Sequence, residues 1–421
     1  MAKQTTPGYR TEQIIETQIA GRDLRLGTRA GFAAWGHIPQ AMELVAQHAK
    51  VNVGERVLVW PCGHGALAVW AAWQTPADHV TALDTHVVAV EAAKRATSLN
   101  RCRAVRTLSA LPSATGTVYD VVLMTQPRAR DVLRLLLLEA WGVLREGGRL
   151  YLAGANEMGI KNAINDAEAL CGPGQLLAYK GGNRVVCFTR GPLPVELPEV
   201  YRAPGVPTGT YRRYEVQVGA AQLAVCSRPG VFSWRELDHG TRLLLDSLQV
   251  RVTDRVLDAA CGTGLAGLLA QRGASKGRVT WLDPELLAVE STRATLAANG
   301  ASGTVLQGDA VDAAAGEGPF TLILGSPGQR GGWAVNDEVA EALAEEAYAA
   351  LEPRGRFVLV TNRFVSYQRA IEARFGAVVT LAENKGYRVL SAEKAFVRKV
   401  RGRPTRRQRQ AADEETVYQI D

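Results

Sequence analysis

The sequence is poor in the residues that build metal centres and disulfide frameworks. Its 421 residues include six cysteines, none in CxxC spacing, and six histidines, of which only His239 lies in the second half. Zinc sites and disulfide frameworks need several such residues at short, regular spacings. We therefore expect neither a metal ion nor a disulfide framework.

Long apolar runs are absent as well. No stretch approaches the roughly 20 residues that a membrane-spanning helix needs, and the opening residues, MAKQTTPGYRTEQ, lack the apolar core of a signal peptide. We expect a cytoplasmic monomer with no membrane association. The composition, 47% hydrophobic and 22% charged, is ordinary for a globular chain with two or three domains.

Positive charge is concentrated at one end. The net charge is +7, and residues 398–409, RKVRGRPTRRQR, carry seven Lys or Arg in twelve positions. We expect residues 398–421 to form a flexible basic arm, because no apolar period runs through the basic stretch. Such an arm favours nucleic acid through phosphate contacts and counterion release, although a solvated tail without a partner has the same composition.

The chain repeats itself with a domain-sized period. The stretch VLVWPCGHG at residues 57–65 matches VLDAACGTG at residues 256–264, 199 positions later. Two further pairs keep the same separation: Asp84 with Asp283, and Asn100 with Asn299. A period of this length indicates a duplicated domain, because solenoid repeats are only about 20–50 residues long.

Each copy alternates short β-branched runs with helical patterns, for example a strand at RVLDAA and a helix at LAGLLAQRG. Such alternation predicts right-handed crossovers and a doubly wound, mostly parallel sheet with helices on both faces. We therefore expect an α/β protein with two tandem Rossmann-like domains, at residues 1–190 and 214–397. Residues 191–213 hold five prolines and are predicted to be the linker.

A glycine-rich turn follows the first strand of the second copy. Asp258 lies in a predicted buried strand, and Cys261, Gly262 and Gly264 come just after it, where a helix begins. Glycines allow a tight turn and let a ligand approach the backbone, and the amides of a helix N-terminus favour a negative group. Ligands of doubly wound sheets bind at this edge, so the turn is a candidate cofactor site.

Two further acids close the neighbouring strands. Asp283, 21 residues after Gly262, is placed to bind both ribose hydroxyls, and Asp309 is placed to reach an adenine amine. One such acid is often a helix N-cap, but three at successive strand ends favour an adenosine ligand with a cationic end, S-adenosylmethionine. NAD stays the alternative, because residues 262–267 match GxGxxG. Asp258 disfavours NAD, since its charge would repel a pyrophosphate.

The first copy lacks most of these features. Val59 stands at the position of Asp258, and Trp60 and Pro61 replace two small residues, whereas Asp84 is kept. We expect bulky, rigid side chains where the methionine end of the cofactor would lie. The first copy is thus predicted to keep the fold without a cofactor, and either to help hold RNA or to brace the second copy.

The order of these parts resembles that of the bacterial small-subunit (16S) ribosomal RNA guanine-N2 methyltransferases, the RsmC-like group with two tandem class I methyltransferase domains. The resemblance covers roughly residues 20–397. Its blocks are GIKNAI at 159–164, PGVFS at 229–233, LDHG at 237–240, VLDAACGTGLAG at 256–267, NRF at 362–364 and VLSAEKA at 389–395.

The resemblance implies an activity. S-adenosylmethionine would give its methyl group to the exocyclic N2 amine of a guanine in small-subunit ribosomal RNA, so the partner would be ribosomal RNA or the small ribosomal subunit. The guanine would leave the RNA stack for the pocket, as in other base-modifying enzymes. The transfer would need in-line positioning of the reactants and no nucleophilic residue.

In that family an Asn-Pro-Pro-Phe loop after the fourth strand orients the target base, and this sequence departs from it. Ser326 takes the place of the Asn, Pro327 is kept, and Gln329 takes the place of the Phe. A serine still accepts a hydrogen bond, but it is shorter and has no amide. These three residues are the candidate catalytic residues.

The missing aromatic has candidate replacements nearby. Phe232, or Trp333 after the loop, would supply a stacking face, and Arg330 would meet phosphate or stack on a base. Trp333 is equally compatible with a half-buried packing residue.

Two functions remain open at this point. The first is an active RNA methyltransferase with an altered target loop, and the second is a non-catalytic RNA-binding pseudo-methyltransferase or ribosome-assembly factor. The intact glycine turn and its three acids favour the enzyme, while the changed loop favours the second function.

Overall fold

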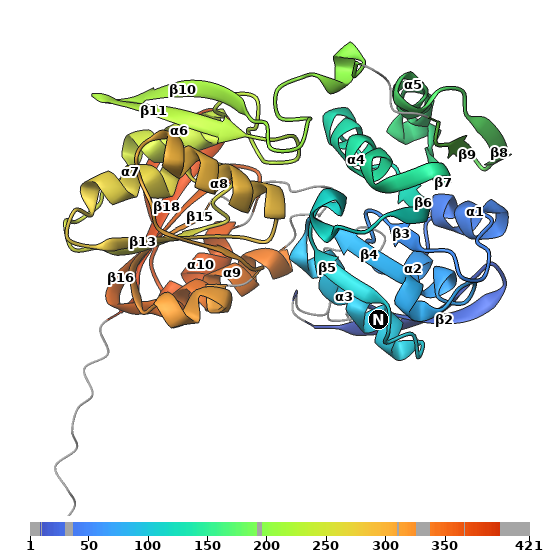
Figure 1. The fold of residues 1–421 in the computed structure, drawn as a ribbon. Helices are drawn as coiled ribbons and strands as arrows, with labels where there is room; N and C mark the ends of the chain where they lie inside the picture. The colour runs from blue at the N-terminus through green and yellow to red at the C-terminus, as the bar shows by residue number, and fades with distance from the viewer. Residues whose placement is uncertain are drawn as a thin grey trace, which may run out of the picture.

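The computed structural model describes residues 9, 11–29, 37–191, 196–309, 311–325, 337–365 and 367–395. Within them the chain forms two seven-stranded sheets, the N-terminal one to the right and the C-terminal one to the left in Figure 1. The predicted fold class, two tandem doubly wound α/β domains, is confirmed. The predicted basic arm, residues 398–421, lies outside the described residues.

The N-terminal sheet has the strand order β5-β4-β3-β6-β7-β9-β8. Its strands are β3 Val57–Val59, β4 Val80–Asp84, β5 Arg106–Ser109, β6 Tyr119–Thr125, β7 Leu144–Ala155, β8 Gln175–Lys180 and β9 Asn183–Thr189. The first five run parallel, and β9 is antiparallel to both β7 and β8. Strand order therefore reverses beside β3, where doubly wound sheets place their ligands.

The C-terminal sheet repeats this topology in the order β14-β13-β12-β15-β16-β18-β17. Its strands are β12 Arg255–Ala259, β13 Arg278–Asp283, β14 Thr304–Gln307, β15 Phe320–Gly325, β16 Leu351–Asn362, β17 Val379–Glu383 and β18 Tyr387–Glu393. Here too the antiparallel strand, β18, lies between β16 and β17. The shared topology agrees with the duplication predicted from the sequence.

Helices cover the sheets in both halves. In the N-terminal half they are α1 Gln40–His48, α2 Ala66–Ala71, α3 Val87–Leu99, α4 Arg130–Val143 and α5 Ile160–Cys171. In the C-terminal half they are α6 His239–Ser247, α7 Leu265–Gly273, α8 Leu286–Ala298, α9 Asp337–Ala350 and α10 Tyr367–Phe375. Short 3₁₀ turns occur at Ala77–His79, Pro112–Thr115, Asn156–Met158, Glu199–Tyr201 and Val311–Glu317.

The central strands bury both of their faces. All five residues of β4 are buried, and neighbouring residues of one strand join different apolar clusters: Val256 packs into one cluster of the C-terminal half and Leu257 into the other. Side chains of a strand alternate between its two faces, so a sheet covered by helices on both sides needs continuous apolar runs. This explains why the strand sequences lack an alternating polar pattern.

A β-hairpin precedes each sheet and is tied to it by an asparagine. The hairpins are β1 Gln13–Ile19 with β2 Arg22–Thr28, and β10 Arg212–Val218 with β11 Ala221–Ser227. Asn100, after α3, donates to the carbonyl oxygen of Arg25 at 2.6 Å and accepts from its amide at 3.1 Å. Asn299, after α8, bonds both backbone groups of Ala224 in the same way, at 2.7 and 3.1 Å. The repeated asparagines are thus structural clamps.

The two halves share part of their apolar core. Val231, Leu287 and Ala288 of the C-terminal half pack into a cluster that is otherwise built by the N-terminal half and by Tyr201 and Val206 of the predicted linker. The division into domains at residues 190 and 214 remains a proposal; β9 ends at Thr189 and β10 begins at Arg212.

Candidate cofactor site

The glycine turn after β12 has the backbone shape that its sequence predicts. Gly262 and Gly264 adopt φ angles of +58° and +77°, in the left-handed region that favours glycine. A Cβ atom on Gly262 would meet nothing within 4 Å, whereas one on Gly264 would lie 2.6 Å from Cγ2 of Thr292. Gly262 therefore borders open space in which a ligand can approach the backbone, and Gly264 is required by close packing.

Two predicted acids hold this turn through its amides. Asp258, 3% exposed, accepts a hydrogen bond from the Gly267 amide at 2.8 Å. Asp283, 1% exposed, accepts from the Gly262 amide at 2.9 Å and from the Glu285 amide at 3.0 Å. Each carboxylate thus fixes the backbone around the turn, in addition to any bond with a ligand.

Cys261 is turned into the protein. Its Sγ atom lies 3.3 Å from Oγ1 of Thr292, and its amide donates to the carbonyl oxygen of Leu282 at 3.0 Å. Because both its thiol and its amide contact other protein atoms, Cys261 helps to hold the shape of the turn. Direct contact between Cys261 and a cofactor stays a prediction.

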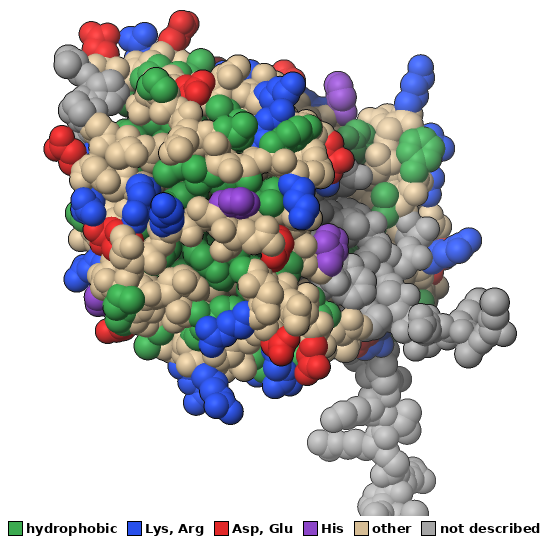
Figure 2. All heavy atoms as spheres, turned by 90° about the vertical axis from the view of Figure 1, so that its right-hand side faces the viewer, with side chains coloured by type: hydrophobic (Ala, Val, Ile, Leu, Met, Phe, Trp, Pro, Cys, Tyr) green, Lys and Arg blue, Asp and Glu red, His purple; other side chains and the backbone are tan. Residues whose placement is uncertain are grey.

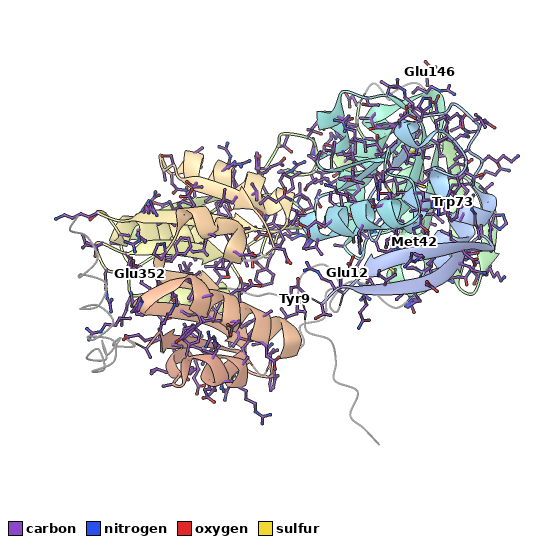
Figure 3. All side chains as sticks on the ribbon, turned by 90° about the horizontal axis from the view of Figure 1, so that it is seen from below. Tyr9, Glu12, Met42, Trp73, Glu146 and Glu352 are labelled. Atoms are coloured by element: carbon purple, nitrogen blue, oxygen red, sulfur yellow. The ribbon has the colours of Figure 1, made fainter. Side chains whose placement is uncertain are left out.

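The third predicted acid, Asp309, is reached by the N-terminal half. It follows β14 and accepts from the Tyr9 hydroxyl at 3.0 Å and from Nη2 of Arg29 at 2.5 Å. The Arg29 guanidinium lies 4.7 Å from the centre of the Tyr9 ring, and Figure 3 shows Tyr9 between the two halves. Residues around the first hairpin therefore border the candidate site in the C-terminal half.

The corresponding turn of the N-terminal half keeps its shape but not its surroundings. Gly63 and Gly65 also have positive φ angles, and Asp84 accepts from the amides of Gly63 and His86, each at 3.1 Å. A Cβ atom on Gly63 would lie 3.7 Å from Cε of Met42, so this face is partly occupied. Asp84 therefore has a structural role in its own turn, and its presence does not indicate a bound ligand.

The other two acids have apolar counterparts there. Val59 is wholly buried at the place of Asp258. Ser109 pairs with Asp84 as Gln307 pairs with Asp283, so Leu111, also buried, corresponds to Asp309. The N-terminal half thus keeps one strand-end acid out of the three.

Trp60 of the N-terminal half fills core space. It is fully buried, and its Nε1 donates to the carbonyl oxygen of Leu136 in α4 at 3.2 Å. Its equivalent in the C-terminal half, Ala259, has only a methyl group in place of the indole. That Trp60 also excludes the methionine end of a cofactor stays a prediction.

The strand-end loops of the two halves meet each other. The Leu286 amide donates to the carbonyl oxygen of Thr85 at 2.7 Å, and the Val87 amide to that of Pro284 at 3.0 Å. Burial raises the pKa of the neighbouring Glu285 to about 8, to which the charges of Asp84 and Asp283 contribute. Burial likewise raises the pKa of Asp84 to about 6.

The predicted target loop lies outside the described residues, and with it Ser326, Pro327, Gln329, Arg330 and Trp333. The last described residue before it, Gly325 of β15, pairs with Ala259 of β12, the strand that leads into the glycine turn.

Phe232 is 40% exposed and lies in the segment between β11 and α6. A Cβ atom on the neighbouring Gly230 would lie 3.4 Å from Cγ2 of Val132 in α4 and 3.5 Å from Cδ1 of Leu287 in α8. This segment is thus held between the halves, and Phe232 is accessible there.

Metal and membrane features can be assessed for the same part of the chain. Among the described residues, no group of three or more His, Cys, Asp or Glu side chains is arranged to hold a metal ion. No helix in the described ranges is long and apolar enough to cross a membrane.

Comparison with known proteins identifies the family of this chain. The model of the methyltransferase small domain matches residues 23–174 and 222–391. The ribosomal RNA small subunit methyltransferase C of Pseudomonas aeruginosa is 35% identical over 283 residues, 67% of this chain and 81% of the relative. That of Pseudomonas putida is 34% identical over 274 residues, 65% of this chain and 79% of the relative.

A solved structure agrees over almost the whole chain. The Thermus thermophilus 16S rRNA N2 methyltransferase RsmC, in complex with AdoMet and guanosine, is 29% identical and superimposes with a TM-score of 0.74. The match covers 91% of this chain and 98% of the T. thermophilus chain. The chain belongs to the ribosomal RNA small subunit methyltransferase C family, and each of its halves is a methyltransferase small domain.

Proposed function

We propose that the chain transfers a methyl group from S-adenosylmethionine to the N2 amine of a guanine in 16S ribosomal RNA, and that its C-terminal half does the chemistry. Family membership carries this proposal, together with the T. thermophilus relative solved with AdoMet and guanosine. The open face of Gly262 between three strand-end acids supports it, because Asp258 and Asp309 have apolar counterparts in the other half.

The residues fit the cofactor in a definite order. Asp283, at the end of β13, would bind the ribose hydroxyls, Asp309 the adenine amine, and Asp258 the cationic amino-acid end. The backbone of Gly262 and Gly264 would lie against the ligand. S-adenosylmethionine supplies an electrophilic methyl group when it is bound, so the protein needs to orient the reactants and exclude water.

The target loop would orient the guanine amine. Ser326, in the place of the family's Asn, would accept one hydrogen bond from the amine, and Pro327 and Gln329 would complete the loop. Phe232 or Trp333 would stack on the flipped base, and Arg330 would contact phosphate. An amine with a polar acceptor and an aromatic face beside it is held in line for transfer.

RNA contacts would be confined to part of the molecule. Figure 2 shows the outer face of the N-terminal half, where Lys and Arg side chains are interspersed with Asp and Glu. We therefore assign RNA contacts to the residues around the target loop and to the basic arm at 398–421. The chain would act in the cytoplasm as a monomer, since its own Tyr9 and Arg29 border the site.

The test is methylation of small ribosomal subunits, or of their ribosomal RNA, taken from cells that lack this enzyme. The chain is supplied with labelled S-adenosylmethionine, and the labelled nucleotide is mapped. We expect one guanine labelled at N2 and no label with Asp283→Asn. Cofactor binding without label would favour the non-catalytic RNA-binding alternative, and label on another base would refute the assigned target.

A further inference from the structure

Two buried side chains hold the carbonyl groups of the glycine turn. Oγ1 of Thr292, in α8, donates to the carbonyl oxygen of Gly262 at 3.1 Å. Nε1 of Trp281, in β13, donates to the carbonyl oxygen of Gly264 at 3.0 Å. Both donors are fully buried. The turn is therefore tied to a helix and a strand other than the two that it connects.

The same two side chains lie close to two of the three glycines. A Cβ atom on Gly264 would lie 2.6 Å from Cγ2 of Thr292, and one on Gly267 would lie 2.2 Å from Nε1 of Trp281. No real Cβ atom tolerates such distances, so both positions need a glycine. Gly65, the counterpart of Gly264, is equally close to Ala93 in the half without Thr292, at 2.6 Å from its Cα atom, so only Gly267 depends on one of the two donors. The third glycine of the GxGxxG pattern is thus explained by the indole of Trp281, without a dinucleotide.

The N-terminal half has lost the donors and the last glycine together. At the same 199-residue separation, Ala82 replaces Trp281, Ala93 replaces Thr292, and Ala68 replaces Gly267. All three alanines are wholly buried. A methyl group at position 68 fits where no indole is present. The half without the cofactor acids therefore also lacks these two donors, although Gly63 and Gly65 keep positive φ angles in its own turn.

Fixing a carbonyl group fixes the amide on the other side of the same peptide unit. In a trans peptide the C=O and N–H groups point in opposite directions. When the Gly262 and Gly264 carbonyls face Thr292 and Trp281 in the core, the amides of Thr263 and Leu265 are directed away from it. Thr292 gives the Gly262 carbonyl a buried hydrogen bond, and breaking such a bond leaves a polar group to be satisfied elsewhere. The Gly264 carbonyl also accepts from the Leu268 amide of α7 at 3.0 Å, so Trp281 adds a second donor there.

We propose that Thr292 and Trp281 are positioning residues that pre-orient the glycine turn for the carboxylate end of the cofactor. This inference rests on the proposed function, since it assigns a role within the same pocket. Neither side chain would touch the cofactor. Each would act through the peptide units of the turn, so the loss of either should weaken cofactor affinity more than it changes turnover at saturating cofactor.

Thr295 provides a matched control in the same helix. It is as fully buried as Thr292, and its Oγ1 bonds both backbone groups of Cys226, at 3.0 and 3.1 Å, instead of the turn. Thr292→Val and Thr295→Val therefore remove the same hydroxyl from the same kind of environment. Only the first removes a bond to the glycine turn.

The experiment is titration calorimetry with S-adenosylmethionine, with a melting curve for every variant. We expect Thr292→Val and Trp281→Phe each to raise Kd about tenfold, and Thr292→Ser to restore it to within about twofold. Thr295→Val should lower the melting temperature as Thr292→Val does and leave Kd unchanged. In methylation assays, Thr292→Val should raise KM for the cofactor with kcat nearly constant.

The outcomes separate this inference from the proposed function. If the unmodified chain binds the cofactor and Thr292→Val and Trp281→Phe bind it equally well, the positioning role is wrong and the proposed function stands. Equal loss of affinity in the Thr292 and Thr295 variants would also overturn it, because the effect would then be general destabilisation. No binding by the unmodified chain would overturn both.

Discussion

The two halves of this molecule share a backbone plan and differ in three places that, as we propose, determine which half binds the cofactor. Both have the hairpin clamped by an asparagine, the glycine turn, and the acid at the end of the second strand. Only the C-terminal half has acids at the other two strand ends, and buried donors behind the turn. The comparison teaches that a strand-end acid alone is weak evidence for a ligand, because the turn needs it for its own amides.

The largest effect on stability should come from the residue that the N-terminal half has gained. Trp60→Ala removes a fully buried indole, which typically costs about 3–5 kcal/mol. We expect this loss in denaturant unfolding of the N-terminal half. The affinity for S-adenosylmethionine should stay as it is in the unmodified chain, and a matching loss of affinity would break the separation between the halves.

Substitution of a strand-end acid should change cofactor affinity only when the acid lies in the C-terminal half. Asp283→Ala should weaken cofactor binding about 100-fold or more, since charge-assisted hydrogen bonds contribute roughly 1.5–3 kcal/mol each. Asp84→Ala should leave the affinity within about twofold, although it removes the acceptor for two amides of its own turn. Calorimetry with S-adenosylmethionine on both variants measures this difference. An equal loss of affinity in the two variants would contradict a single cofactor site.

Substitution of either asparagine clamp should lower stability by a similar amount in the two halves. Asn100→Ala and Asn299→Ala each remove a pair of hydrogen bonds to a hairpin strand. We expect each to cost about 1–2 kcal/mol of stability. Thermal melting of the two variants should give similar shifts, and a shift in only one would show that the hairpins are not equivalent.

The last expected effect is a pH dependence of stability at the junction of the halves. Because the pKa of Glu285 is raised from 4.5 to about 8, the folded chain holds a proton there that the unfolded chain releases. The free energy of unfolding therefore falls as pH rises from about 4.5 through 8. Glu285→Gln should remove this contribution.

Melting temperatures across that range test this point. The difference between Glu285→Gln and the unmodified chain should grow in favour of the variant as pH rises, and reach its limit above about pH 8. A difference that stays constant with pH would show that the Glu285 carboxyl group has the same pKa in both states.

Much of the fold and of the candidate site could be predicted from local sequence patterns. The duplication and the strand–helix alternation are visible in residues a fixed distance apart, and the structure bears them out. The glycine turn and its acids could be predicted too, because a tight turn and a strand end depend on neighbouring residues. The carboxylates of Asp258 and Asp283 nevertheless bond backbone amides, a role that the sequence does not distinguish from ligand binding.

Contacts between distant parts of the chain could not be predicted. Arg29 meets Asp309 across 280 positions, and Tyr9 meets it across 300, with no motif that marks either residue. Arg29 even has a repeat partner, Arg228, which instead pairs with Glu290 at 2.8 Å. The packing of Gly267 against Trp281 could not be predicted either, because the pattern GxGxxG also fits a dinucleotide site.

The central claim is that one cofactor binds, and that it binds in the C-terminal half. The most direct measurement is a crystal structure of the whole chain with S-adenosylmethionine, with the stoichiometry measured by calorimetry on the same preparation. We predict one molecule per chain, lying against Gly262 with its ribose at Asp283. A molecule bound at Gly63 and Asp84, or a stoichiometry of two, would contradict it.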